Sequence, residues 1–292
     1  MPALPHFETP TALEYFASLV AEDDRFPLLE AAVAVAQDET PGLDVQGVLA
    51  EIDALAERLR RRIPADAMPL ARVRLLNHYF FRELGFAGNV NDYYDRRNSC
   101  LHEVLRTRRG IPITLALLYV EFAAQLGLRA SGLTFPGHFL VKLHLEGGSC
   151  PGDVVIDPFD GRSLSRADLE ERLLPYRPQQ GGGGPQWPLG VYLQSATPRA
   201  VIARLLRNLK EIHRAARDWP RLLAVMHRLV ILLPRDWDER RDRALVLAEL
   251  GRADQACSDL GAYLAHAPRA PDVAAMRELL EQWRRLPGAL PQ

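Results

Sequence analysis

The chain has 292 residues, of which 48% are hydrophobic and 25% charged, as in a folded globular protein rather than a disordered chain. Its 36 basic and 37 acidic residues give a formal net charge of −1, which excludes an overall electrostatic clamp for nucleic acid but not a local basic patch. Three cysteines without a C-x-x-C pair exclude a disulfide framework and a cysteine zinc site, so we expect neither metal nor cofactor.

The first ninety residues are predicted to form a helical N-terminal region. Several apolar-rich segments there are bounded by prolines, and one of them carries apolar residues at three- and four-residue steps, which is typical of one buried helix face. Gly85 is a plausible helix stop. The predicted helices cover residues 9–22, 26–37, 44–63 and 68–84.

Residues 91–178 are predicted to form an α+β core. A helix over 92–106 precedes a turn, and Pro112 is placed to start a second, almost wholly apolar helix over 113–126. Residues 139–145 alternate between apolar and polar positions, which indicates a half-buried antiparallel strand. Two further strands are predicted at 128–135 and 153–156, and a helix with a small antiparallel sheet implies α+β packing.

Residues 179–197, rich in glycine and proline, are predicted to form a linker, and residues 198–292 a helical repeat region. Pro234 and Pro268 lie 34 residues apart, with Gly251 between them at a predicted turn. This period is that of the tetratricopeptide repeat, a helix–turn–helix unit that stacks on its neighbours. The predicted helices cover residues 200–216, 219–233, 237–250, 253–266 and 271–284.

His138 and Asp157 are the first candidate site residues. His138 opens the second predicted strand and Asp157 ends the third, and an antiparallel hairpin brings a strand start and a strand end together. A histidine oriented by a carboxylate makes up two members of a nucleophile–base–orienter triad. We expect the two side chains within hydrogen-bonding distance, either as part of a functional polar pocket or as a pair that fixes the hairpin.

The segment of residues 90–165 resembles the transglutaminase-like core, a papain-type Cys–His–Asp fold. The resemblance rests on Gly-Ile-Pro-Ile-Thr at 110–114, Gly-His-Phe-Leu-Val-Lys at 137–142 and Ile-Asp-Pro at 156–158. Together with the repeats, it is similar to a bacterial family that joins such a core to C-terminal tetratricopeptide repeats. One branch of this family is named for a proposed invasion-gene regulator.

The position that the resemblance assigns to the nucleophile is occupied by Pro112. Active members open this helix with Gly-x-Cys, whereas Gly110-Ile111-Pro112 offers no nucleophile. Two weaker candidates remain, the thiol of Cys100 on the preceding helix and the hydroxyl of Thr114. Cys150 follows a glycine turn, and we expect it to lie far from the helix start.

Two functions therefore stand against each other. The first is a cytoplasmic, non-catalytic or regulatory protein whose repeats bind a protein partner, with His138 and Asp157 vestigial. The alternative is a cysteine-type amidohydrolase, protease or acyl transferase that uses Cys100 or Thr114 with His138 and Asp157. The sequence lacks a signal peptide and an apolar run of about 20 residues, so we expect neither export nor a membrane partner.

Overall fold

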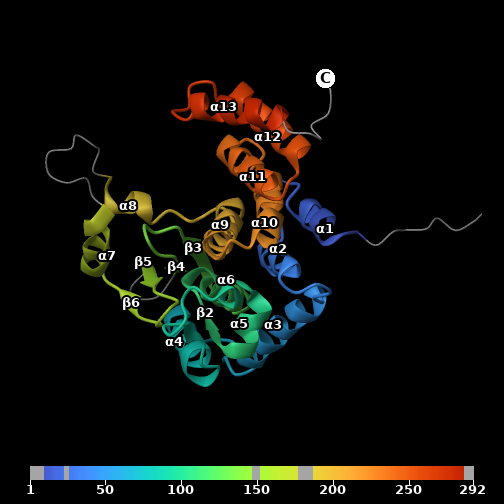
Figure 1. Ribbon diagram of the computed structural model, residues 1–292. Coiled ribbons are helices and arrows are strands. Elements are labelled where there is room, and N and C mark those ends of the chain that lie inside the picture. Colours follow the sequence, from blue (N-terminus) through green and yellow to red (C-terminus); the bar gives the residue numbers. More distant parts are fainter. Residues whose placement is uncertain (1–9, 23–25, 147–151, 177–186, 286–292) are drawn as a thin grey trace, which may run out of the picture. The chain divides into compact units, whose positions relative to one another are not determined.

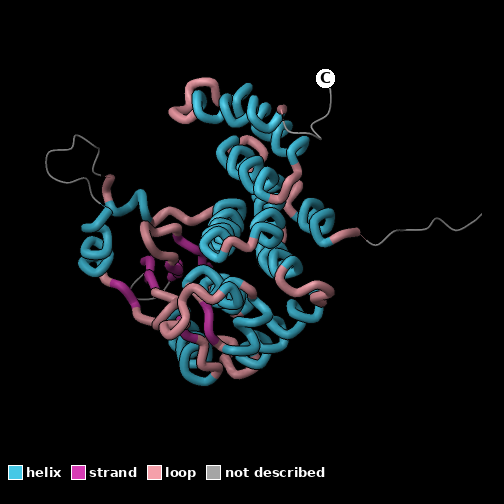
Figure 2. Tube along the Cα trace, viewed as in Figure 1, coloured by secondary structure: helices cyan, strands magenta, loops and turns pink. Residues whose placement is uncertain are grey.

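A computed structural model describes residues 10–22, 26–146, 152–176 and 187–285. The chain divides into two units. The core unit comprises Pro27–Ala36 and Leu43–Leu205, and the repeat unit comprises Met1–Phe26, Gln37–Gly42 and Leu206–Gln292. Among the described residues every strand belongs to the core unit, as Figure 2 shows, so the predicted α+β class is confirmed. The boundaries near residues 91, 179 and 198 stay predictions, and the glycine run at 181–184 lies outside the described residues.

The core unit contains most of the expected helices, with two differences. The helix predicted over 68–84 changes at His78 into a π-helix, and the one predicted over 92–106 is wrong in its first half. Residues 92–95 form a turn, because the Asp95 carboxylate accepts the N–H of Arg97 and starts a 3₁₀ turn instead. The helices are α2 (Leu28–Val35), α3 (Val45–Arg60), α4 (Pro69–Asn77), η2 (His78–Glu83), η3 (Arg96–Ser99), α5 (Leu101–Thr107), α6 (Pro112–Gln125), α7 (Arg166–Leu173), η4 (Leu174–Tyr176) and α8 (Leu189–Tyr192), with η1 (Ala36–Asp38) at the unit boundary.

Helix α6 is the centre of the core unit. Ten of its 14 residues are buried, including fully buried Leu115, Leu118 and Tyr119. A helix that is apolar on all faces needs neighbours on all sides. It contacts α2, α3, α4 and α5 as well as strands β3 and β4. The almost uninterrupted apolar sequence over 113–126 therefore predicts its burial correctly.

The main sheet has four antiparallel strands in the order β3-β4-β5-β6. Its strands are β3 (Arg129–Leu133), β4 (Leu140–Leu145), β5 (Gly152–Ile156) and β6 (Ser163–Leu164). On one face, Leu140 and Val155 pack with Leu169 and Leu173 of α7, which lies beside β5 and β6 in Figure 1. This cover explains why Leu140 is fully buried although it shares the more polar side of the predicted alternation.

A two-residue parallel pairing, absent from the sequence analysis, ties the start of α6 to the turn after β5. Strand β1 (Ala87–Gly88) pairs with β2 (Arg109–Gly110). The N–H of Gly88 donates to the carbonyl of Phe159, 2.8 Å away, and a Cβ on Gly88 would lie 2.1 Å from the Phe159 ring. Only glycine fits there, and the close approach holds the Asp157 turn against β1.

The repeat unit consists of antiparallel helices whose predicted bounds are confirmed to within a few residues. Fully buried Ala256, Leu260 and Tyr263 line one face of α12, and Gly251 adopts φ +70° in the turn before it. Figure 1 shows α10 to α13 following one another as consecutive helical hairpins. The helices are α1 (Ala12–Leu19), α9 (Pro198–Ala216, which begins in the core unit), α10 (Trp219–Leu232), α11 (Trp237–Glu249), α12 (Ala253–His266) and α13 (Val273–Arg284).

A buried arginine attaches the N-terminal helix α1 to α10 of the repeat unit. Arg228 is fully buried, and its guanidinium donates to both carboxylate oxygens of Asp38 at 2.6 and 2.9 Å. It also lies 4.9 Å from the ring centroid of Phe16. A bidentate pair of this kind holds its two partners in one geometry, because two parallel hydrogen bonds must form together.

We expect Ala256→Arg to destabilise the repeat unit by about 3 kcal/mol or more. The substitution forces a long cation into the tight packing of α12 on α11, where burying a charge is costly. Thermal unfolding followed by circular dichroism measures the loss.

Gly261→Ala on the same helix is the matched control. A Cβ at Gly261 meets no atom within 4 Å, so alanine should raise the stability of the helix by about 0.5–1 kcal/mol. An unchanged melting temperature for Ala256→Arg would show that the assigned repeat register is wrong.

Candidate functional site

His138 and Asp157 meet as their strand positions predict. Asp157 directly follows β5, and His138 lies two residues before β4, in the turn that Gly137 makes with φ +67°. The Nε2 of His138 lies 2.9 Å from Oδ1 of Asp157. The carboxylate can only accept, so Nε2 donates, and a neutral imidazole then presents Nδ1 as an acceptor. The predicted distance is confirmed, while a catalytic role for the pair stays a prediction.

The Asp157 carboxylate serves more than the histidine. Its Oδ1 also accepts the N–H of Phe159 at 3.0 Å, and its Oδ2 accepts from Nη1 of Arg172 at 2.8 Å. Burial works to raise the pKa of Asp157, but the hydrogen bonds from His138, Phe159 and Arg172 outweigh it and leave that pKa below its ordinary value. The carboxylate is therefore ionised and shared between an imidazole and a guanidinium.

The first turn of α6 provides no free nucleophile at Thr114. The helix begins at Pro112, as predicted, and Thr114 is fully buried. The Thr114 hydroxyl donates to the carbonyl of Asn98 at 2.8 Å and accepts the N–H of Ile111 at 3.2 Å. These bonds fix the start of the helix to the preceding 3₁₀ turn, which is a structural use of the hydroxyl.

The thiol of Cys100 is also buried. The residue is 2% exposed and occupies the extended position between η3 and α5. Its Sγ lies 3.7 Å from the carbonyl oxygen of Arg96, an acceptor that suits a neutral thiol. Cys150 lies outside the described residues, and whether Cys100 or Thr114 acts as a nucleophile stays a prediction.

Three further residues belong to the surroundings of His138 and were missed from the sequence. Arg172 lies on α7, whose capping box between Ser165 and Asp168 is a readable helix start. Tyr176 packs so closely on Gly137 that a Cβ there would lie 1.7 Å from its hydroxyl oxygen. Arg204 of α9 donates to the carbonyl of His138 at 3.3 Å, and no local pattern announces this contact.

The described residues contain no group of three or more His, Cys, Asp or Glu side chains that could hold a metal ion. In the same part of the chain, no helix combines the length and the apolar character needed to cross a membrane.

A second candidate site is a groove within the repeat unit. It is a cavity of about 730 Å³ bounded by residues of α9, α10, α11 and α13. Its apolar wall includes Trp219 and Met226 from α10 and Leu279 and Trp283 from α13. Trp219 and Trp283 are only partly buried, so indole surface remains available in the groove. Large apolar side chains around a concave surface are typical of a binding site.

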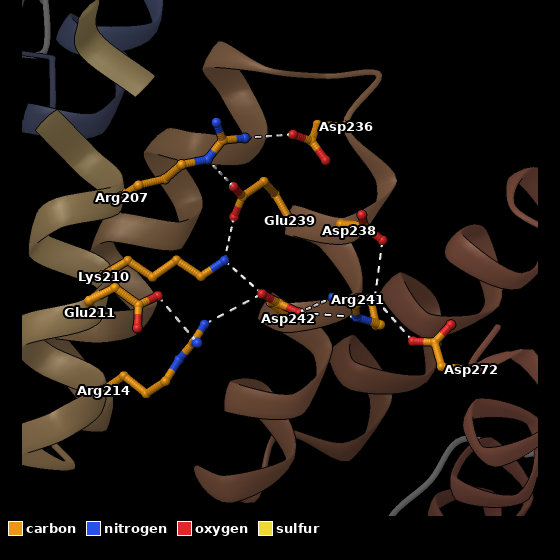
Figure 3. A network of polar contacts seen from close by, with 10 residues as sticks. All are labelled: Arg207, Lys210, Glu211, Arg214, Asp236, Asp238, Glu239, Arg241, Asp242 and Asp272. Atoms are coloured by element: carbon orange, nitrogen blue, oxygen red, sulfur yellow. Dashed lines mark hydrogen bonds and ion pairs between the residues drawn. The ribbon is translucent and has the colours of Figure 1, made fainter. Parts of the chain in front are cut away.

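The polar side of this groove is a network of ion pairs, drawn in Figure 3. The Nζ of Lys210 donates to Glu239 at 2.6 Å and to Asp242 at 2.7 Å, and Asp242 in turn accepts from Arg241 at 2.8 Å. Burial works to raise the pKa of Asp242, but the hydrogen bonds and charges of Lys210 and Arg241 together outweigh it, so that pKa lies below its ordinary value. Of these residues, Arg214, Arg241 and Asp242 line the groove, where exposed Glu249 adds a second acidic side chain.

Comparison with known proteins supports both halves of this description. Residues 46–207 match the model of the transglutaminase-like superfamily, and residues 209–281 match that of the tetratricopeptide repeat. A UPF0162 protein of Xylella fastidiosa is 35% identical over 88% of this chain and 89% of its own length. A UPF0162 protein of Vibrio cholerae is 27% identical over 87% of this chain and 92% of its own length. Human F-box only protein 21 is 32% identical over 43% of this chain and 24% of its own length. No solved structure was found to match.

We expect Asp157→Asn to destabilise the core unit by about 1–3 kcal/mol at pH 7, because Arg172 and His138 lose their ionised partner. The folded pKa of Asp157 is lowered, so its contribution is complete above the unfolded pKa of about 3.9 and is lost as the pH falls through the folded value. Urea unfolding of the native chain and the variant at pH 7 and at about pH 3 measures the loss of stability and its dependence on pH.

The control is Asp160→Asn, an exposed carboxylate that accepts the N–H of Arg162. It should change stability by less than about 0.5 kcal/mol at either pH. A difference between native protein and Asp157→Asn that stays constant over this pH range would contradict the assignment.

Proposed function

Since the chain belongs to the transglutaminase-like superfamily and to the bacterial UPF0162 proteins, we propose that it is a cytoplasmic, non-catalytic interaction protein. Its repeat groove binds a segment of a partner protein, and its transglutaminase-like core is degenerate. The observation that carries the proposal is the groove itself, with the partly buried indole rings of Trp219 and Trp283 on its lining. Tetratricopeptide repeats present concave surfaces suited to such segments.

The chemistry of the groove defines the segment that fits it. Its apolar wall favours a bulky apolar side chain, since burying such a side chain is worth about 1.5–3 kcal/mol. Exposed Glu249 on the groove lining favours a Lys or Arg close to that side chain. The occupant is therefore a partner segment that combines an apolar anchor with a basic residue.

The degenerate core is supported by the residues around His138. Pro112 occupies the position of the expected nucleophile, and the hydroxyl of Thr114 holds the helix start. Asp157 divides its charge between His138 and Arg172, which weakens its hold on an imidazolium. A base activates a nucleophile efficiently only when a carboxylate stabilises the protonated base.

The alternative is a cysteine-type amidohydrolase, protease or acyl transferase that uses Cys100 or Thr114 with His138 and Asp157. One observation favours it: Nε2 of His138 is held by Asp157 at 2.9 Å, which leaves Nδ1 to face a nucleophile. The buried thiol of Cys100 or the buried hydroxyl of Thr114 must then become accessible during turnover.

For the groove, we expect a photo-crosslinking amino acid in place of Glu249 to capture a partner whose cross-linked segment contains an apolar and a basic residue. Leu279→Glu should reduce this adduct by about tenfold, because it places a charge on the apolar wall. Mass spectrometry identifies the cross-linked peptide, and circular dichroism checks that the variant folds.

The same amino acid in place of Arg269, which is exposed and does not line the groove, is the control. Equal adducts from positions 249 and 269, or adducts that Leu279→Glu leaves unchanged, would show that the groove is not the binding surface.

For the core, we expect iodoacetamide to alkylate Cys100 slowly, because the residue is only 2% exposed, and at the same rate in His138→Ala. A chain with Cys150→Ser and Cys257→Ser reports on Cys100 alone. Rapid alkylation that disappears in His138→Ala would instead establish an activated thiol and favour the enzyme.

A further inference from the structure

Arg204 is a half-buried cation without a counter-charge. Among the residues that the structure describes, no carboxylate forms an ion pair with it, and its hydrogen bond goes to the carbonyl of His138 at 3.3 Å. Two other arginines of α9 and α10 are neutralised: Arg207 by Asp236 and Arg228 by Asp38. Burial lowers the pKa of Arg204, which reflects the cost of holding this charge away from water.

The side chains around the His138 backbone that Arg204 contacts are aromatic and partly exposed. The phenol groups of Tyr93 and Tyr176 work to raise the pKa of Arg204, although burial lowers it more. Tyr176 packs on the backbone of Gly137, and the ring centroid of Tyr93 lies 6.1 Å from that of Phe159. Phe159 in turn lies 6.4 Å from the His138 ring. Tyr93 is 38% and Tyr176 55% exposed, so solvent reaches this group of side chains.

The net charge of this group of side chains matches a ligand that carries a single negative charge. Arg172 and Asp157 neutralise each other, which leaves the guanidinium of Arg204 as one positive charge. A carboxylate matches it, whereas a doubly charged phosphate would leave an excess of negative charge. A planar guanidinium also binds a carboxylate through two parallel hydrogen bonds. Nδ1 of His138 is an acceptor in the neutral ring and suits a peptide N–H.

We propose that Arg204, His138, Tyr93 and Tyr176 form a binding site for a carboxylate group of a peptide. Arg204 pairs with the carboxylate, His138 accepts an adjacent amide N–H, and the tyrosine rings pack on the neighbouring side chain. The carboxylate comes either from a chain terminus or from an acidic side chain. This site lies in the core unit and does not depend on the repeat groove.

The test is calorimetric titration of the full chain with defined probes. N-acetylphenylalanine carries a terminal carboxylate, and N-acetylglutamic acid α-amide carries only a side-chain carboxylate. At least one of them should bind, and the tighter one identifies the source. N-acetylphenylalanine amide, without a carboxylate, should bind at least about tenfold more weakly than the acid. Equal binding of acid and amide, or preferred binding of inorganic phosphate, overturns the proposal.

Arg204→Gln should weaken carboxylate binding by about tenfold or more while still folding. Removal of the unneutralised cation offsets the loss of the long hydrogen bond to the carbonyl of His138, so the melting temperature without ligand should stay equal or rise. If Arg204 were purely structural, its replacement by glutamine would lower the melting temperature. Arg204→Lys, which keeps the charge but loses the planar fork, should bind with intermediate affinity.

The matched control is Arg166→Gln, a surface arginine of the core unit that is already paired with Glu170. It should bind the carboxylate probe as the native chain does. Native affinity in Arg204→Gln, or a fall in its melting temperature together with the loss of binding, assigns Arg204 to structure alone and overturns the proposal.

Discussion

The burial of α6 is the constraint on which the core unit depends. A helix without a polar face has no surface that can be left in water, so the chain must surround it. The sheet covers it through β3 and β4, and four helices cover it elsewhere. His138 and Asp157 lie at the ends of strands in that sheet, and β1 fastens the turn after Asp157 to the backbone just before the helix. The site geometry is thus a result of packing around one apolar segment.

Some charged side chains of the two units are neutralised by ion pairs, and others are not. Buried Asp157 pairs with half-buried Arg172 and holds His138, and Lys210 pairs in the same way with Glu239 and Asp242 in the repeat unit. Such networks fix orientation because leaving one partner buried alone costs more than the pair gains. The chain therefore has rigid polar elements in both units.

The sequence predicts those features of the fold that depend on local patterns of residues. The 34-residue period placed the repeat helices to within a few residues, and strand ends brought His138 to Asp157. The β1–β2 pairing involves two residues in each strand, too few for any periodicity to show. Arg204 reaches the carbonyl of His138 across 66 residues of chain, a contact that only the approach of α9 decides. The π-helix that begins at His78 likewise has no counterpart in the predicted helix over 68–84.

The position of α1 has a consequence for biosynthesis. Helix α1 packs against α10. Arg228 of α10 also donates a hydrogen bond to Asp38, which lies in a segment after α1. About 200 residues separate the end of α1 from the start of α10. At about 5–20 residues per second, the ribosome exposes α1 for roughly ten seconds or more before its partner is made. An eight-residue helix is not stable alone over that time, so the repeat unit closes only late in synthesis, after the residues of the core unit have left the ribosome.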